Sequence, residues 1–112
     1  MLASKYRLKA KEIDQVKREG TIHQSENFGA SILKREDGGP LRFGFIISKK
    51  ISNHAVQRNR IKRAMSEAVR HNLHKLEQGS DVAFLPKVTI ASKSTDEIMK
   101  EVSIFILNNL QK

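Results

Sequence analysis

The stretch from about Val56 to Leu76 repeats apolar side chains at the spacing of an α-helix, and this pattern constrains the fold more than any other part of the chain. At about 100° per residue, one side of the helix is apolar. Its members are Ile61, Met65, Ala68, Val69, Asn72 and Leu76. The other side carries Asn59, Arg63, Ser66 and Arg70, with Arg60 and Lys62 on the flanks. We therefore expect a helix that packs through one face and presents a basic face to solvent.

The positive charge of the chain is concentrated in the same region. Residues 49–75 hold eight Lys or Arg and one Glu, and the whole chain of 112 residues has a net charge of +9. Residues 1–18 hold six basic and two acidic side chains, and the other segments are slightly acidic. This concentration predicts a polyanionic partner, although a solvated basic face is the alternative. Binding to a membrane surface requires bulky apolar residues beside the charges, and here they are committed to the core, so we expect no membrane partner.

Shorter patterns predict helices and strands around the central helix. Residues 8–18 indicate a short helix that ends near Gly20. Phe28, Ala30 and Ile32 alternate as in a strand. Residues 35–40 are a turn cluster, and residues 41–48 then indicate a second, central strand, so that the two strands would form a hairpin with a long loop.

The C-terminal third of the chain adds one strand and one helix to this prediction. Residues 81–85 indicate a third strand, closed by Pro86. Ser94 and Glu97 have the spacing of a capping box, and the helix behind them extends to about Leu110. The order α-β-β-α-β-α predicts an α+β fold, a two-layer α/β sandwich. The length is that of one domain, and the concentrated positive charge leads us to expect that residues 1–112 form a single RNA-binding domain.

Several kinds of chemistry are missing from the sequence. The chain has no Cys, which excludes disulfides and thiol nucleophiles. Its carboxylates, among them Asp81, Asp96, Glu97 and Glu101, are scattered and form no paired or two-metal arrangement. His71 and His74 have a spacing that could hold a metal but lack a third ligand. We therefore expect no catalytic, cofactor or metal site in the protein itself. The N-terminal residues contain no apolar run typical of a signal peptide, so we expect a cytoplasmic location.

The run from Arg42 to Arg63 closely resembles the protein component of bacterial ribonuclease P. A strand ends in Ser48-Lys49-Lys50, a short loop with Asn53 and Ala55 follows, and then comes Arg58-Asn59-Arg60-Ile61-Lys62-Arg63. The order and spacing are those of the family. Lys5-Tyr6-Arg7-Leu8-Lys9 before the first helix and Gly79-Ser80-Asp81-Val82 also fit, so the resemblance covers nearly the whole chain.

The resemblance implies a function as well as a fold. The family is the protein subunit of a ribonucleoprotein endoribonuclease that removes the 5′ leader from precursor tRNA. Its active site lies in the RNA subunit, which also binds the catalytic magnesium, so magnesium is expected only in the RNA-containing holoenzyme. The family fold is similar to the ribosomal protein S5 domain 2-like fold, with a left-handed βαβ crossover. The partners implied are the catalytic RNA and precursor tRNA, and no protein partner is predicted.

The resemblance also assigns residues to the two RNA partners. Arginine forks onto phosphate oxygens, lysine supplies a point charge, and asparagine can hydrogen-bond phosphate, sugar or base. For the catalytic RNA we expect contacts from Lys49, Lys50, Asn53, Arg58, Asn59, Arg60, Lys62, Arg63 and Arg70. For the leader, which the family binds in a cleft between the sheet and the first helix, we expect contacts from Lys5, Arg7, Lys9, Ile13, Lys17, Phe28 and Ala30.

The sequence departs from the family at several positions. Ile13 and Lys17 stand where the first helix usually carries aromatic residues, Ser66 stands where a basic residue is common, and Lys87 stands where the family often has Arg. Phe28 is then the remaining aromatic residue for stacking on a base, and Lys17 would supply charge instead. The alternative is that Phe28, Ala30 and Ile32 all belong to the core.

A second function remains open from the residues alone. A small structural or ribosomal RNA-binding protein would share the basic helix but would support no cleavage. An independent metal-dependent nuclease is disfavoured because no ligand cluster is visible in the sequence.

Overall fold

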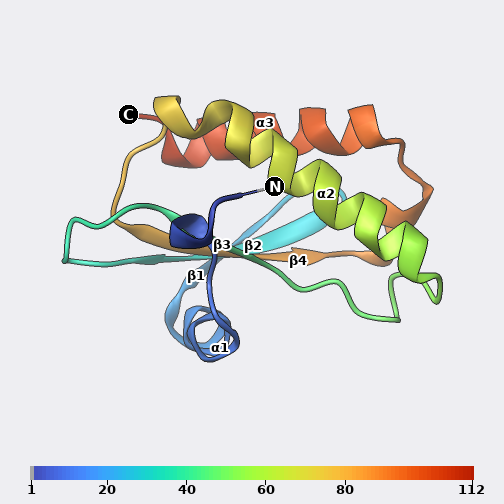
Figure 1. The fold of residues 1–112 in the computed structure, drawn as a ribbon, viewed down its shortest axis with the longest axis horizontal. Helices are drawn as coiled ribbons and strands as arrows, with labels where there is room; N and C mark the ends of the chain where they lie inside the picture. The colour runs from blue at the N-terminus through green and yellow to red at the C-terminus, as the bar shows by residue number, and fades with distance from the viewer. Residues whose placement is uncertain (1) are drawn as a thin grey trace.

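A four-stranded sheet in the order β1-β2-β4-β3 forms the centre of the computed structural model, which describes residues 2–112 (Figure 1). The α-helices and strands are α1 (Ala10–Glu19), β1 (Thr21–Gln24), β2 (Phe28–Lys34), β3 (Arg42–Phe45), α2 (Ala55–Asn72), β4 (Ser80–Pro86) and α3 (Thr95–Leu110). Three short 3₁₀ turns, η1 (Ser4–Tyr6), η2 (Leu73–Lys75) and η3 (Val88–Ser92), complete the chain. The predicted α+β class is confirmed, and the predicted elements occur in the predicted order.

Strand β1 is an addition that the sequence did not predict. It covers only Thr-Ile-His-Gln and pairs antiparallel with β2 at the edge of the sheet. Its single aliphatic residue, Ile22, is exposed, so the segment shows no alternation of apolar and polar residues that could have indicated a strand.

The predicted hairpin between β2 and β3 is wrong. β2 pairs antiparallel with β4, and β3 pairs parallel with β4 on its other side, so β4 lies between them. Val82, Ala83 and Phe84 of β4 are all fully buried, and a strand that is apolar on both faces belongs inside a sheet. β3 is therefore an edge strand rather than a central one. The N-terminal segment covers its outer edge, where the Leu8 amide donates to the Phe43 carbonyl at 2.9 Å.

Helices cover both faces of the sheet. α2 and α3 lie side by side on one face, and the shorter α1 lies on the other (Figure 1). Successive residues of β2 face opposite sides of the sheet, one toward α2 and α3 and the next toward α1. Phe28 and Ala30 join the large core under α2 and α3, whereas the Ser31 hydroxyl donates to the Val16 carbonyl of α1 at 2.7 Å. The two predicted layers are thus the sheet and the α2–α3 pair, and α1 adds a small third layer.

The central helix packs as its periodicity predicts. Ile61, Met65, Ala68, Val69 and Asn72 are buried, and the helix ends at Asn72, after which the turn η2 leads to the buried Leu76. One expectation is wrong: Ser66 was placed on the outer face, yet it is only 4% exposed. Its hydroxyl donates to the Lys62 carbonyl at 2.8 Å, and this bond lets a small polar side chain be buried.

The capping box predicted for α3 is confirmed. The Glu97 amide donates to the Ser94 hydroxyl at 3.1 Å, and the Ser94 amide donates to the Glu97 carboxylate at 3.0 Å. The backbone hydrogen bond from Ser94 is the main cause that lowers the pKa of Glu97, so this carboxylate remains charged at the helix N-terminus.

Candidate nucleic-acid interface

The outward face of α2 and the loop before it carry the basic residues predicted to bind the catalytic RNA. Six of the nine side chains are exposed and make no hydrogen bond or ion pair within residues 2–112; these are Lys49, Lys50, Asn53, Asn59, Lys62 and Arg63. Asn59, Lys62 and Arg63 belong to α2 itself, and the buried opposite face of this helix gives them a rigid support. Cationic groups on a rigid helix can contact phosphate without a cost for ordering the backbone, so that only the side chains lose conformational freedom.

Arg58 and Arg60 are held by the protein itself. Arg58 donates to the Ser52 carbonyl at 2.9 Å, which ties the loop to the first turn of α2. Arg60 donates to the Lys93 carbonyl at 3.0 Å, and so connects α2 to the segment before α3. Both side chains are half-buried. They therefore have a structural role in addition to the charge they present.

Arg70 is paired with an acidic neighbour. Its Nη2 lies 2.8 Å from Glu67 Oε2, and hydrogen bonding to Arg70 is the main cause that lowers the pKa of Glu67 to about 2. The positive charge of Arg70 is thus partly neutralised at the C-terminal end of the basic face. Of the nine predicted residues, the six free side chains are best suited to bind a polyanion.

The basic face of α2 is flanked by two hollows. A pocket of about 110 Å³ lies between α2, β3, α1 and the N-terminal segment, and Lys62 and Ser66 of α2 reach it. A larger groove of about 580 Å³ lies on the other flank, between α2 and α3, and is lined by Asn59 and Arg63 among others. An RNA strand that lies along α2 would therefore have a recess available on each side.

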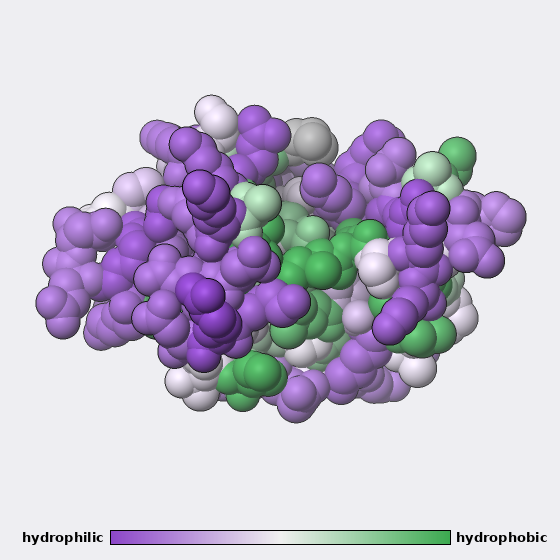
Figure 2. Space-filling view, turned by 90° about the horizontal axis from the view of Figure 1, so that it is seen from below, coloured by the Kyte–Doolittle hydropathy of each residue, from purple (hydrophilic) through white to green (hydrophobic). Residues whose placement is uncertain are grey.

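The smaller pocket contains two of the residues predicted to bind the leader, Arg7 and Ile13. Ile13 of α1 packs directly on Gly44 of β3, where an added Cβ would lie 2.7 Å from Ile13 Cγ1. Gly44 therefore allows the close approach of α1 to the sheet. From the α1 side, the surface shows an apolar area in its middle with hydrophilic side chains on both sides (Figure 2).

The remaining residues predicted to bind the leader divide into two groups. Lys5, Lys9 and Lys17 are exposed on the N-terminal segment and on α1. Phe28 and Ala30 are 0% exposed, so their assignment to the leader site is wrong. Their strand face lies under α2 and α3, where the Phe28 ring meets Phe84 and Phe105 edge-on at centroid distances of 5.5 and 5.2 Å. The alternative that these residues belong to the core is confirmed.

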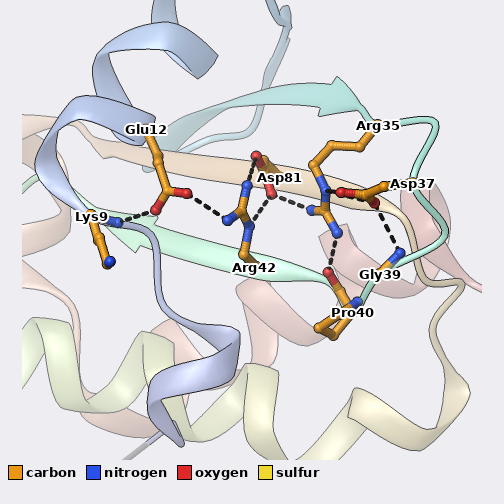
Figure 3. A network of polar contacts seen from close by, with 8 residues as sticks. All are labelled: Lys9, Glu12, Arg35, Asp37, Gly39, Pro40, Arg42 and Asp81. Carbon is orange, nitrogen blue, oxygen red and sulfur yellow. Dashed lines mark hydrogen bonds and ion pairs between the residues drawn. The ribbon is translucent and has the colours of Figure 1, made fainter.

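A network of ion pairs fixes α1 against the sheet, and no pattern in the sequence predicted it. The Arg42 guanidinium lies between the carboxylates of Glu12 and Asp81 (Figure 3). Arg42 contacts Glu12 at 2.5 Å and Asp81 at 2.8 Å, and Asp81 also binds Arg35 of the loop after β2. Hydrogen bonding to Asp81 is the main cause that raises the pKa of Arg42. Asp81 and Glu12 are therefore structural carboxylates.

A second polar cluster holds the turn between β1 and β2, and Glu101 of α3 is its acceptor. The Glu101 carboxylate accepts from the Asn27 amide at 2.9 Å and from the Ser25 hydroxyl at 2.5 Å. Lys87 donates to the Ser25 carbonyl at 2.7 Å. Glu101 lies 74 residues from Asn27 in the chain, so no local pattern could have predicted the contact.

The described residues contain neither a cluster of metal ligands nor a membrane-spanning helix. No group of three or more His, Asp or Glu side chains gathers there as metal ligands would. No helix within residues 2–112 is both long and apolar enough to cross a bilayer.

Comparisons with known proteins agree on one family. The sequence profile of the family described as Ribonuclease P matches residues 2–109. The ribonuclease P protein component of Finegoldia magna is 34% identical over 88 residues, which are 79% of this chain and 71% of that protein. The ribonuclease P protein component of Bacillus cereus is 29% identical over 102 residues, which are 90% of this chain and 88% of that protein.

Solved structures share the fold. The RNase P protein of Staphylococcus aureus matches with a TM-score of 0.85 at 20% identity, covering 96% of this chain and 98% of that chain. The RNase P protein of Thermotoga maritima matches with a TM-score of 0.79 at 20% identity, covering 91% of this chain and 96% of that chain.

Proposed function

Because this chain belongs to the ribonuclease P protein family, we propose that it binds the catalytic RNA of a ribonuclease P ribonucleoprotein and the 5′ leader of precursor tRNA. In this role it supports endonucleolytic removal of the leader in the cytoplasm. The observation that carries the proposal is the face of α2, where exposed cationic side chains that have no partner among residues 2–112 stand on a helix anchored in the core. Phosphate contacts of this kind position an RNA and supply most of its affinity.

The two RNA partners are assigned to different surfaces. The catalytic RNA binds along α2 and the loop before it, where Arg63, Lys62, Lys49 and Lys50 neutralise phosphates. The leader passes the small pocket beside Ile13 and Gly44, with Arg7 at the pocket and Lys17 exposed on α1. This placement replaces the face near Phe28, which is buried.

The chemical step belongs to the RNA subunit in this proposal. The catalytic magnesium would be held by the RNA. Asp81 and Glu101 are engaged in structural bonds, and no three carboxylate or imidazole groups of residues 2–112 gather as ligands. The protein then contributes to the reaction by binding and orienting the precursor against the catalytic RNA.

Reconstitution tests the proposal. The purified protein is added to the catalytic RNA of ribonuclease P and a precursor tRNA at a magnesium concentration too low for the RNA to act alone. We expect cleavage of the leader to be restored. An inert protein that still binds RNA would indicate a structural RNA-binding role, and cleavage by the protein without the RNA would indicate an independent nuclease.

A further inference from the structure

The groove between α2 and α3 combines an apolar floor with a cationic rim. Its volume is about 580 Å³, which lies within the range of pockets that take small ligands. Val56, Ala64 and Met99 supply the apolar part, and Asn59, Thr95, Arg60 and Arg63 supply polar and cationic groups. The one carboxylate of the lining, Glu67, is paired with Arg70, so the two rim arginines still give the groove a net positive charge. Neither the core nor the ion-pair networks explain this combination.

Val56 is the feature of the groove that most needs an explanation. It is 83% exposed, the largest value among the exposed large apolar side chains of the described residues. It lies in the first turn of α2, where a polar residue would serve the helix equally well. A single exposed apolar side chain is common on protein surfaces, but Val56 shares one groove with Ala64 and Met99. A concave apolar lining with a few polar groups beside it is the usual form of a ligand site.

The two arginines of the rim are suited to bind phosphate. Arg60 is held in one orientation by its bond to the Lys93 carbonyl at 3.0 Å and by longer bonds to Gln57 and Thr95. A guanidinium has five N–H donors, so some remain for a ligand. Arg63 makes no hydrogen bond or ion pair within residues 2–112 and is exposed. One arginine is therefore fixed and the other is free to follow the ligand.

We infer that this groove takes one unstacked nucleotide of the bound RNA, with its base against Val56 and Met99 and its phosphate at Arg60 and Arg63. The inference rests on the proposed function, since it presumes that RNA lies along α2. A nucleotide fits the chemistry because its base has an apolar face and its phosphate is anionic. The net charge of +7 over residues 49–75 favours such a ligand over a neutral or basic peptide.

The first test compares two valines. Val56→Ala removes apolar contact area from the groove, and Val88→Ala is the matched control, because Val88 is 65% exposed but does not line the groove. Affinity for the catalytic RNA of ribonuclease P is measured at several salt concentrations. We expect Val56→Ala to bind about three- to tenfold more weakly with an unchanged salt dependence, because it loses apolar contact only. Val88→Ala should bind like the wild type.

The second test locates the nucleotide. Chemical modification of unpaired bases in the catalytic RNA is compared with and without protein. We expect one base to be protected by the wild type and by Val88→Ala but to regain reactivity with Val56→Ala and with Met99→Gln. Melting temperatures of all variants identify any loss of affinity that comes from unfolding.

The outcomes separate the inference from the function on which it rests. A wild-type protein that does not bind the catalytic RNA would contradict the proposed function, and the inference with it. A wild type that binds, together with Val56→Ala that binds equally well and protects the same bases, would reject the nucleotide site and leave the proposed function intact. This second outcome is also the one expected if the groove takes a protein partner. Weaker binding by Val56→Ala without any change in base protection would equally reject a base in the groove.

Discussion

Glu12 of α1 and Arg42 of β3 form an ion pair of 2.5 Å between residues that lie 30 positions apart in the chain. The Glu12 carboxylate also accepts the Lys9 amide at 2.8 Å, so one side chain both caps α1 and attaches it to the sheet. Arg42 in turn binds Asp81 of β4. The position of α1, and with it the pocket beside Ile13, depends on this chain of contacts.

Replacement of Glu12 tests this attachment. Glu12→Gln can keep the cap through its amide oxygen but loses the charge attraction to Arg42. The pair is more than a quarter exposed on both sides, so we expect a loss of about 0.5–1 kcal/mol in the free energy of unfolding. Amide hydrogen exchange should become faster in α1 and stay unchanged in β4. Glu19→Gln, at the other end of α1, is the control, and exchange in α1 at the wild-type rate would show that Glu12 does not hold the helix.

Replacement of Phe28 distinguishes a core residue from a leader contact. Its ring is 0% exposed and packs on Phe84 and Phe105, so Phe28→Ala should lower the free energy of unfolding by about 3–5 kcal/mol. Urea unfolding measures the loss. In the fraction that remains folded, the preference for precursor tRNA over mature tRNA should be kept. A variant of nearly native stability that has lost this preference would contradict the core assignment and indicate that Phe28 contacts the leader.

The basic face separates into free and anchored cations, which two variants compare. Arg63→Gln removes an exposed side chain without a partner in residues 2–112 and should weaken binding of the catalytic RNA by about 1–3 kcal/mol without a change in melting temperature. Arg58→Gln also removes the hydrogen bond to the Ser52 carbonyl and should lower the melting temperature. Equal melting temperatures for the two variants would contradict a structural role of Arg58.

Salt dependence measures how many phosphates the face engages. Each phosphate contact contributes about −0.7 to −0.9 to the slope of log K against log salt concentration. The double variant Lys62→Gln and Arg63→Gln should therefore have a slope shallower by about 1.4–1.8 than the wild type if each residue binds one phosphate. A filter-binding titration from low to moderate salt supplies both slopes. Identical slopes would place the RNA elsewhere on the protein.

Glu67 provides a prediction for low pH. Its pKa is lowered from 4.5 to about 2, chiefly by hydrogen bonding to Arg70. Because the pKa is lower in the folded state, the contribution of this carboxylate to stability is present above pH 4.5 and is lost as the pH falls towards 2. An NMR titration of the side chain should give the low pKa in the wild type and a higher one in Arg70→Gln. The same pKa in both proteins would exclude Arg70 as the main cause.

The sequence by itself determined the features that depend on neighbours along a helix. The buried stripe of α2 and the capping box of Ser94 and Glu97 both follow from contacts three or four residues apart. The concentration of charge in residues 49–75 likewise identified the surface that the structure leaves free, and its motif placed the chain in its family.

Only the tertiary structure decided how the strands pair and which face each residue occupies. Alternation in β2 correctly put Phe28 and Ala30 on one face of the strand. Helices cover both faces of the sheet, so alternation alone could not show that this face is buried under α2 and α3 and does not bind a ligand. The partners of β2 and β3 depended on β4, which follows in the chain only after α2.

The tertiary structure also decided which cations are free. Arg60 and Arg63 look alike in the sequence, yet Arg60 is bonded to the Lys93 carbonyl 33 residues away, whereas Arg63 is exposed and makes no bond within residues 2–112. The ion pair between Glu12 and Arg42, which attaches α1 to the sheet, likewise joins residues far apart in the chain. Such contacts form between segments that meet only after the chain has folded, so no pattern of adjacent residues carries them.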